Sequence, residues 1–274
     1  MKIGTSARSF DLSEEFFKNL SENKIDAIEI SRRPGQYDCI DYEELSRLSK
    51  AYNIMLWSYH LPFTPRDESD VSSVDATVRE RTMKYLGELI KKATDIGVEK
   101  FVIHPTSTEP DEARDERIKY AMESLGRLAE LADTCGAIIC VEDLPRTCIG
   151  NTSDEILKLI SANDKLRVCL DTNHLMQETP MDFIKKVGNK IKTLHVSDYD
   201  FVNECHWIPG EGKINWHELY QALQDVGYDG VWMYEVGRQH LRDVIGRDLE
   251  LSDFYKNANE IFNGEDLTVF SSSK

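Results

Sequence analysis

The sequence predicts an α/β fold, a single (β/α)8 barrel formed by residues 1–274, and three observations lead to this prediction. Short apolar runs typical of strands alternate with runs of helical periodicity along the whole chain. Eight strand-like runs, each followed by a helical run, fit into 274 residues, which is the count and the usual size of this barrel. The segment after the first run, GTSARSF, lacks the glycine-rich turn expected of a doubly wound open sheet.

The strand-like runs are apolar almost throughout, as parallel strands buried on both faces should be. In chain order they are KIGTSA (2–7), AIEIS (27–31), IMLWSYH (54–60), KFVIHP (100–105), AIICVED (137–143), LRVCLD (166–171), IKTLHVS (191–197) and GVWMYEV (230–236). No linker, low-complexity segment or close repeat interrupts the series, so we expect one domain.

Helical segments between these runs show apolar residues at a spacing of three to four. Three of them are marked by Leu12, Phe16, Phe17 and Leu20, by Met83, Leu86, Ile90 and Ala93, and by Leu219, Ala222, Leu223 and Val226. TSDE at 152–155 has the pattern of a capping box, and NWHE at 215–218 resembles one. Helix ends are expected at Gly97, Gly136 and Gly227.

The composition, 41% hydrophobic and 30% charged residues, is that of an ordinary globular protein. A net charge of −16 disfavours nucleic acid as a partner, because its binding depends on lysine and arginine side chains that neutralise phosphates. The six cysteines form no CxxC pair, which indicates reduced thiols. The chain begins with a strand pattern rather than a signal segment, and no apolar run approaches the ~20 residues of a membrane span. We therefore expect a cytoplasmic protein without a membrane partner, and homo-oligomerisation is left open.

Acidic residues and histidines stand at the carboxyl ends of six strand-like runs. These ends carry His60, His104, Glu142, Asp171, His195 and Glu235, and His174 follows Asp171 by three residues. A single histidine there is more often structural, and a single aspartate is more often a helix cap. Six such ends in otherwise apolar contexts indicate a shared cause, because the carboxyl ends of barrel strands surround one pocket.

Several carboxylates gathered in one pocket repel each other unless protons or a cation neutralise them. Mixed imidazole and carboxylate ligands suit a divalent metal. The sequence therefore predicts a metal site with one divalent ion, and Mn, Co, Zn, Fe and Mg are all open as its identity.

With these residues in place, the sequence resembles the xylose-isomerase-like TIM-barrel superfamily, which includes sugar isomerases and epimerases, inosose dehydratases and endonuclease IV. The resemblance covers nearly the whole chain and is most specific in VEDLPRTCIGNTSDEIL, CLDTNH, HVSD and CHWIPGEGKINWHELYQAL. It implies that one metal is held by Glu142, Asp171, His195 and Glu235. It also implies that Glu142 and Glu235 are the catalytic acid and base.

The segment Glu204–His206 departs from both branches of the superfamily. The epimerases place a substrate-binding arginine here and endonuclease IV an Asp-x-His metal pair, whereas this chain has Glu-x-His. Glu204 is therefore a possible additional metal ligand. We expect substrate contacts from His60, His104, His174, His206 and Trp207. Asp198 and Asp200 are interpreted as solvated loop acids, and a turn-stabilising role for Glu211 is as plausible as a substrate contact.

These features predict a divalent-metal-dependent sugar isomerase or epimerase, which transfers a proton next to a carbonyl through an enediolate. Its partner would be a small sugar or polyol. A keto-inositol dehydratase of the inosose type would use the same ligand set and is the first alternative. An endonuclease IV-like phosphodiesterase is the second, because eight of its nine metal ligands match in type and Glu204 replaces the ninth. The negative charge of the chain counts against it.

Overall fold

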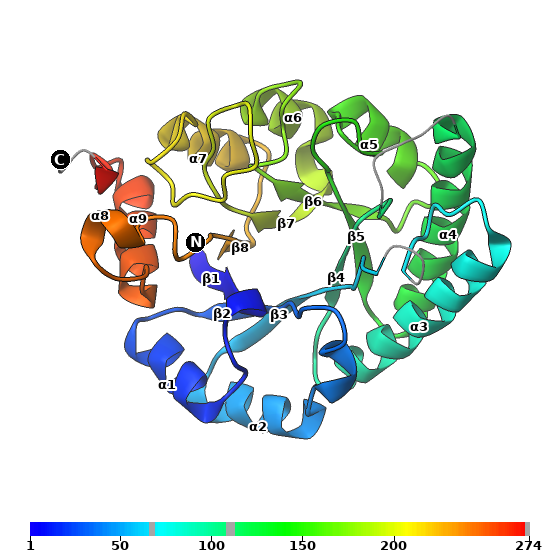
Figure 1. The fold of residues 1–274 in the computed structure, drawn as a ribbon, viewed down its shortest axis with the longest axis horizontal. Coiled ribbons are helices and arrows are strands. Elements are labelled where there is room, and N and C mark those ends of the chain that lie inside the picture. The colour runs from blue at the N-terminus through cyan, green and yellow to red at the C-terminus, as the bar shows by residue number, and fades with distance from the viewer. Residues whose placement is uncertain (66–68, 108–112, 272–274) are drawn as a thin grey trace.

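The computed structural model describes residues 1–65, 69–107 and 113–271. Eight parallel strands form one sheet in the order β7-β6-β5-β4-β3-β2-β1-β8 (Figure 1). The strands are β1 (Lys2–Ser6), β2 (Ala27–Ile30), β3 (Met55–His60), β4 (Lys100–Ile103), β5 (Ile138–Glu142), β6 (Arg167–Asp171), β7 (Ile191–His195) and β8 (Val231–Tyr234). All eight coincide with the strand-like runs of the sequence.

The sheet closes on itself between β7 and β8. A parallel bridge joins Val196 to Tyr234 just beyond the end of β7. The Val196 amide donates to the Met233 carbonyl at 2.8 Å, and the Glu235 amide donates to the Val196 carbonyl at 3.1 Å. The prediction of a single (β/α)8 barrel is therefore confirmed.

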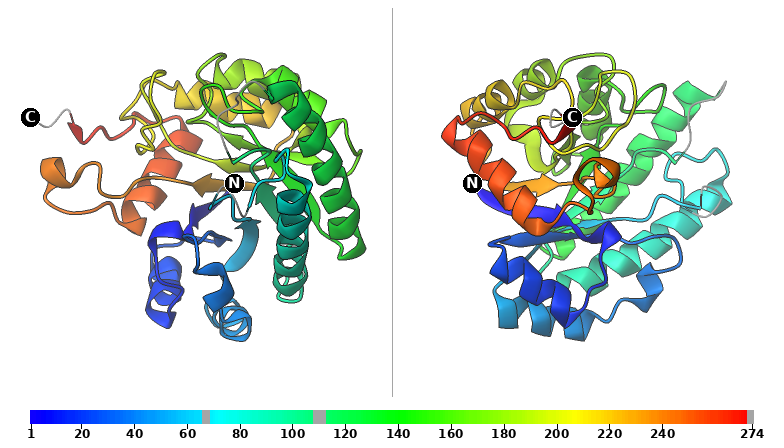
Figure 2. Two further views of the ribbon diagram at one scale, coloured as in Figure 1. Left: turned by 45° about the vertical axis from the view of Figure 1, so that its right-hand side comes forward. Right: turned by 60° about the vertical axis from the view of Figure 1, so that its left-hand side comes forward.

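Helices surround the strands as an outer layer, which two further views show from other sides (Figure 2). They are α1 (Glu14–Glu22), α2 (Tyr42–Tyr52), α3 (Ala76–Thr94), α4 (Arg114–Thr134), α5 (Ser153–Ile160), α6 (Pro180–Val187), α7 (Trp216–Asp225), α8 (Arg242–Ile245) and α9 (Leu251–Asn263). The three helices marked by apolar spacing correspond to α1, α3 and α7. Within the described part of the chain, no helix is long and apolar enough to cross a membrane.

The predicted helix ends are present, with one difference at α5. Thr152 caps this helix by accepting a hydrogen bond from the Glu155 amide at 3.3 Å. The Glu155 carboxylate does not complete a capping box, because it accepts from the Gly150 amide and pairs with Arg114. Asn215 caps α7. Positive φ angles after helices are found at Gly97, Gly136 and Gly227.

All six cysteines are free thiols, and those on β5 and β6, Cys140 and Cys169, are buried. This agrees with the expectation of reduced cysteines. Because the strands are parallel, their carboxyl ends all open at the same end of the barrel, where the polar residues of the strand ends meet.

Candidate metal centre

Glu142, the last residue of β5, lies at the centre of the polar cluster. Its Oε2 is 3.1 Å from Nε2 of His60 at the end of β3 and 3.1 Å from Nε2 of His104 after β4. Its Oε1 is 3.0 Å from Nδ1 of His195 at the end of β7. The Glu142 side chain is buried, so these three imidazoles replace its water contacts.

Four ligand atoms converge at the carboxyl ends of β5 to β8. Glu142, Asp171, His195 and Glu235 each offer one atom, and these atoms lie within 4.8 Å of one another. Nδ1 of His195 is 3.1 Å from a Glu235 oxygen and 3.8 Å from Oδ2 of Asp171. These are the four residues that the family resemblance implies as metal ligands.

The surroundings of Asp171 Oδ2 show whether the four converging residues fit a cation. This oxygen is buried, and within the described residues it has no hydrogen bond, although Nε2 of His174 lies 3.5 Å away. The pKa of the Asp171 carboxyl is raised to about 6. Burial is the largest cause, His174 opposes it, and the neighbouring Glu235 and Glu142 add to it. Three carboxylates and one imidazole nitrogen at this separation fit a divalent ion, which would supply the missing partner.

On the side of the ring away from the ligand cluster, His195 contacts Glu29, a buried residue of β2. Both Glu29 oxygens lie 3.0 Å from Nε2 of His195, and the Ser58 hydroxyl donates to Oε2 of Glu29 at 2.8 Å. A proton on Nε2 leaves the lone pair of Nδ1 directed at the ligand cluster. Glu29 was not among the residues predicted from the sequence. Its signal there was a single charged residue inside the apolar run AIEIS.

Two of the predicted substrate residues, His60 at the end of β3 and His104 after β4, belong to a second group of possible metal ligands. His60, His104 and Glu142 offer three atoms within 4.8 Å of one another. His60 is fixed by a contact of 2.9 Å between its Nδ1 and the Leu61 carbonyl. The His104 ring stacks on Phe63 with centroids 4.0 Å apart.

Two further histidines face the cluster from the loops after β6 and β7. Nδ1 of His174 lies 2.8 Å from the Asp143 carbonyl, which leaves Nε2 on the side of Asp171. His206 has a positive φ of 48°, and its Nδ1 lies 3.3 Å from the Glu235 carbonyl. Asn173 positions His206, because its Oδ1 accepts a hydrogen bond from the His206 backbone amide at 3.0 Å. The sequence analysis gave Asn173 no role.

The other predicted residues of this loop lie differently. Glu204 lines the cavity, where it pairs with Arg146 at 2.9 Å, and it belongs to neither group of converging donors. Trp207 is not among the residues that line the cavity, and its backbone forms an antiparallel bridge with Asp198. The Glu211 carboxylate accepts from the amides of Phe270 and Ser271, which ties the loop to the end of the chain.

The interpretation of Asp198 as a solvated acid is wrong. Its side chain is fully buried. Oδ1 accepts from the amides of Tyr199 and Ile214, and Oδ2 accepts from the Gly210 amide and from the indole of Trp216. The carboxylate replaces water for four donors and so holds the loop together. Asp200 is half-buried and accepts only from its own turn, at Val202 and Asn203.

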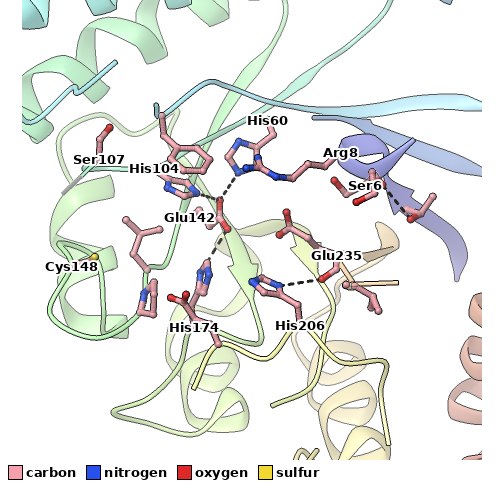
Figure 3. A pocket seen from close by; sticks show the side chains of 18 of the residues that line it. Ser6, Arg8, His60, His104, Ser107, Glu142, Cys148, His174, His206 and Glu235 are labelled. Atoms are coloured by element: carbon pink, nitrogen blue, oxygen red, sulfur yellow. Dashed lines mark hydrogen bonds and ion pairs between the residues drawn. The ribbon is translucent and has the colours of Figure 1, made fainter. Parts of the chain in front are cut away.

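These side chains surround a cavity of about 480 Å³ at the carboxyl end of the barrel (Figure 3). His60, His104, Glu142, His174, His206 and Glu235 all line it. Pockets for small molecules are commonly of this size. The cavity also receives Ser6 and Arg8 from the end of β1, which the sequence analysis did not single out.

Comparison with known proteins places this site in a family. The family model described as "Xylose isomerase-like TIM barrel" matches residues 17–255. The chain belongs to this family. It is similar to a D-psicose 3-epimerase of Ruminiclostridium cellulolyticum, with 27% identity over 231 residues that cover 78% of this chain and 75% of that protein. A probable endonuclease 4 of Finegoldia magna is 24% identical over 238 residues, 81% of this chain and 82% of that protein.

Among solved structures, a D-tagatose 3-epimerase-like protein superposes with a TM-score of 0.81 at 23% identity. The match covers 96% of this chain and 97% of that one. At this identity the likeness concerns the fold, and it agrees with the closed barrel described above.

Proposed function

We propose that this member of the xylose isomerase-like TIM-barrel family is a divalent-metal-dependent sugar epimerase or isomerase. The observation that carries the proposal is the convergence of Glu142, Asp171, His195 and Glu235 beside a sugar-sized cavity. The similarity to a psicose 3-epimerase over most of both chains supports a sugar as the substrate class.

Glu142, Asp171, His195 and Glu235 would hold the ion. When bound, a divalent ion supplies Lewis-acid polarisation of a substrate carbonyl. The chain itself must move the proton, and two of its carboxylates are suited to do so.

Glu142 and Glu235 are the proposed acid and base. Burial disfavours ionisation of Glu142, but His195 and His104 hold its pKa well below its usual range. The Glu235 side chain is 19% exposed. Desolvation raises the pKa of its carboxyl, but the interactions with His195 lower it, so the net pKa is again below the usual range. Both side chains are therefore ionised at neutral pH and able to accept a proton. One carboxylate removes a proton from the carbon next to the carbonyl and keeps it. The other first takes up a proton from solvent and then donates that proton to the opposite face of the enediolate, so that solvent hydrogen enters the product.

The histidines of the cavity would orient the sugar. His174 and His206 lie on the side of Asp171 and Glu235, and His60 and His104 lie on the side of Glu142. Each can exchange a hydrogen bond with a hydroxyl group, which fixes the reacting carbon relative to the two carboxylates. An inosose-type dehydratase would use the same proton removal and then expel a β-hydroxyl.

A second candidate function is phosphodiester cleavage, and one observation favours it. His60, His104 and Glu142 could hold a further ion, and two-metal sites are common in nucleases. The similarity to a probable endonuclease 4 points the same way. The net charge of −16 opposes DNA binding, because phosphate contacts require many cationic side chains.

The deciding experiment is hydrogen exchange in deuterated water. The purified protein, loaded with Mn²⁺, is incubated with a panel of ketoses, aldoses and keto-inositols, and the products are followed by NMR. A substrate should take up deuterium at the epimerised or isomerised carbon. Net loss of water would establish the dehydratase instead, and nicking of abasic DNA without any sugar exchange would establish the phosphodiesterase.

A further inference from the structure

Arg8 is a cationic side chain of the cavity that no part of the proposed proton transfer uses. It follows β1 and is half-buried. Figure 3 shows its side chain extending from the end of β1 toward His60. Its guanidinium carbon lies 5.7 Å from the centroid of the Phe63 ring, which in turn stacks on His104. The Arg8 head group is therefore on the same side of the cavity as the two histidines.

The carboxylates that line the cavity already have partners. Glu142 contacts three imidazoles, Glu235 contacts His195, and Glu204 pairs with Arg146. Among the residues that the structure describes, no carboxylate lies within 4.0 Å of the Arg8 guanidinium. The chain has 49 acidic residues against 33 lysines and arginines. In such a chain, a cavity arginine without an acidic partner is unexpected and indicates that it binds something else.

Ser6 adds a second, independent observation. This residue ends β1, lines the cavity and is only 7% exposed. Its Oγ is buried and makes no hydrogen bond to any described residue. A buried hydroxyl without a partner is costly, and a ligand atom in the cavity would satisfy it.

Arg238 increases the positive charge on this side of the cavity. It lies after β8, next to β1 in the barrel, and also lines the cavity. Its Nε donates to the Leu249 carbonyl at 2.7 Å, and its guanidinium covers the Phe10 ring at 4.5 Å. Two arginines and an unsatisfied hydroxyl thus border the β8–β1 side, whereas Glu142 and Asp171 end β5 and β6 and Glu235 directly follows β8.

We propose that the substrate carries an anionic group, a phosphate ester or a carboxylate, which Arg8 binds with the Ser6 hydroxyl as a further donor. This inference rests on the proposed sugar function and deepens it. The sugar carbonyl would lie at the carboxylate cluster and the anion at the end of β1. Arginine suits this role because its planar guanidinium donates two parallel hydrogen bonds to phosphate or carboxylate oxygens.

The test measures binding by titration calorimetry to the Mn²⁺-loaded protein. The probes are D-fructose, D-fructose 1-phosphate, D-fructose 6-phosphate and D-fructuronate, with D-tagatose and its 6-phosphate as a second pair. At least one anionic sugar should bind about tenfold or more tightly than its neutral counterpart, as a charge-assisted hydrogen bond would give. Which probe shows the preference distinguishes a phosphate from a carboxylate.

Three variants assign the preference to Arg8. Arg8→Gln should reduce the ratio of anionic to neutral sugar affinity to less than about threefold, and Arg8→Lys should retain part of the preference. Arg33→Gln removes an exposed arginine outside the cavity and should keep the full preference. Circular dichroism and metal analysis of each variant establish folding and loading.

Any of three results would overturn the proposal. One is that no anionic sugar binds more tightly than its neutral counterpart. A second is that Arg8→Gln keeps the preference, which would mean that another group binds the anion. The third is that Arg8→Gln loses the metal, which would mean that Arg8 balances the charge of the carboxylate cluster. Hydrogen exchange on the same panel separates this inference from the proposed function. Exchange with neutral ketoses and no anion preference leaves the function standing, whereas an Arg8-dependent preference without exchange leaves only the anion site.

Discussion

Both carboxylate oxygens of Glu29 lie 3.0 Å from Nε2 of His195, on the side of the imidazole opposite the converging ligand atoms. This contact joins β2 to β7 across the barrel interior, and neither residue is exposed. The carboxylate fixes the ring orientation and the tautomer of a histidine whose other nitrogen faces Glu142 and Glu235. The geometry of the proposed metal site therefore depends on a residue that does not itself belong to the ligand cluster.

The first prediction concerns this contact. Glu29→Gln should weaken metal binding by about 10–100-fold, the usual effect of removing the carboxylate behind a ligating histidine. Competition with a fluorescent chelator measures the dissociation constant, and Glu43→Gln, at an exposed position of α2, is the control. An unchanged constant in a folded Glu29→Gln protein would show that the tautomer of His195 is set elsewhere.

The second prediction concerns proton transfer. Glu142→Gln and Glu235→Gln should each lower turnover by about 10²–10⁴-fold, because each removes a general acid or base. Metal content must be measured in the same samples, since both residues are also expected ligands. Solvent deuterium incorporation should fall with turnover. If either variant keeps its metal and also keeps normal exchange, that carboxylate does not move the proton.

The third prediction concerns metal removal. Dialysis against a chelator should lower the melting temperature, and one equivalent of a divalent ion should restore it. A ligand that binds only the folded state stabilises it by about 2.7 kcal/mol at a concentration of 100 times Kd.

His60→Ala distinguishes the number of ions. We expect its metal content to stay near one per chain while sugar binding weakens, because His60 is outside the four-ligand cluster. A fall from two or three ions per chain in the native protein would instead support the phosphodiesterase.

The fourth prediction concerns the loop after β7. Asp198→Ala should reduce the free energy of unfolding by about 3 kcal/mol or more, because several buried donors lose their acceptor together. Urea unfolding measures this loss. Asp200→Asn, in the same loop but half-buried and bonded only within its own turn, is the matched control and should change stability much less. Equal losses in the two variants would mean that burial of Asp198 does not stabilise the loop.

The strands and their polar ends were predictable from sequence, because six of the eight apolar runs end near a histidine or an acid and parallel strands bring those ends together. Glu29 was not found, since it lies inside its run rather than at the end. Asp198 was misinterpreted because a carboxylate bonded to four donors and a carboxylate in water look the same in sequence. Only the folded loop, with Gly210 and Trp216 directed back at Asp198, distinguishes them. Ser6 lies within the first strand-like run and Arg8 just after it, and neither carries a signal in the sequence before the closed barrel places β1 beside β8.

Glu142 belongs to both groups of converging donors, with Oε1 directed at His195 and Oε2 at His60 and His104. Two ions at this position would share one carboxylate and repel each other at short range, so occupancy of one group must lower the affinity of the other. Loading is therefore expected to be sequential and negatively cooperative, with separate tight and weak phases in a titration. The number of ions per chain measured in excess metal would then include an ion at the weaker site. At trace metal concentrations that site would not be filled. The number of ions bound would then be set by the free metal concentration around the protein.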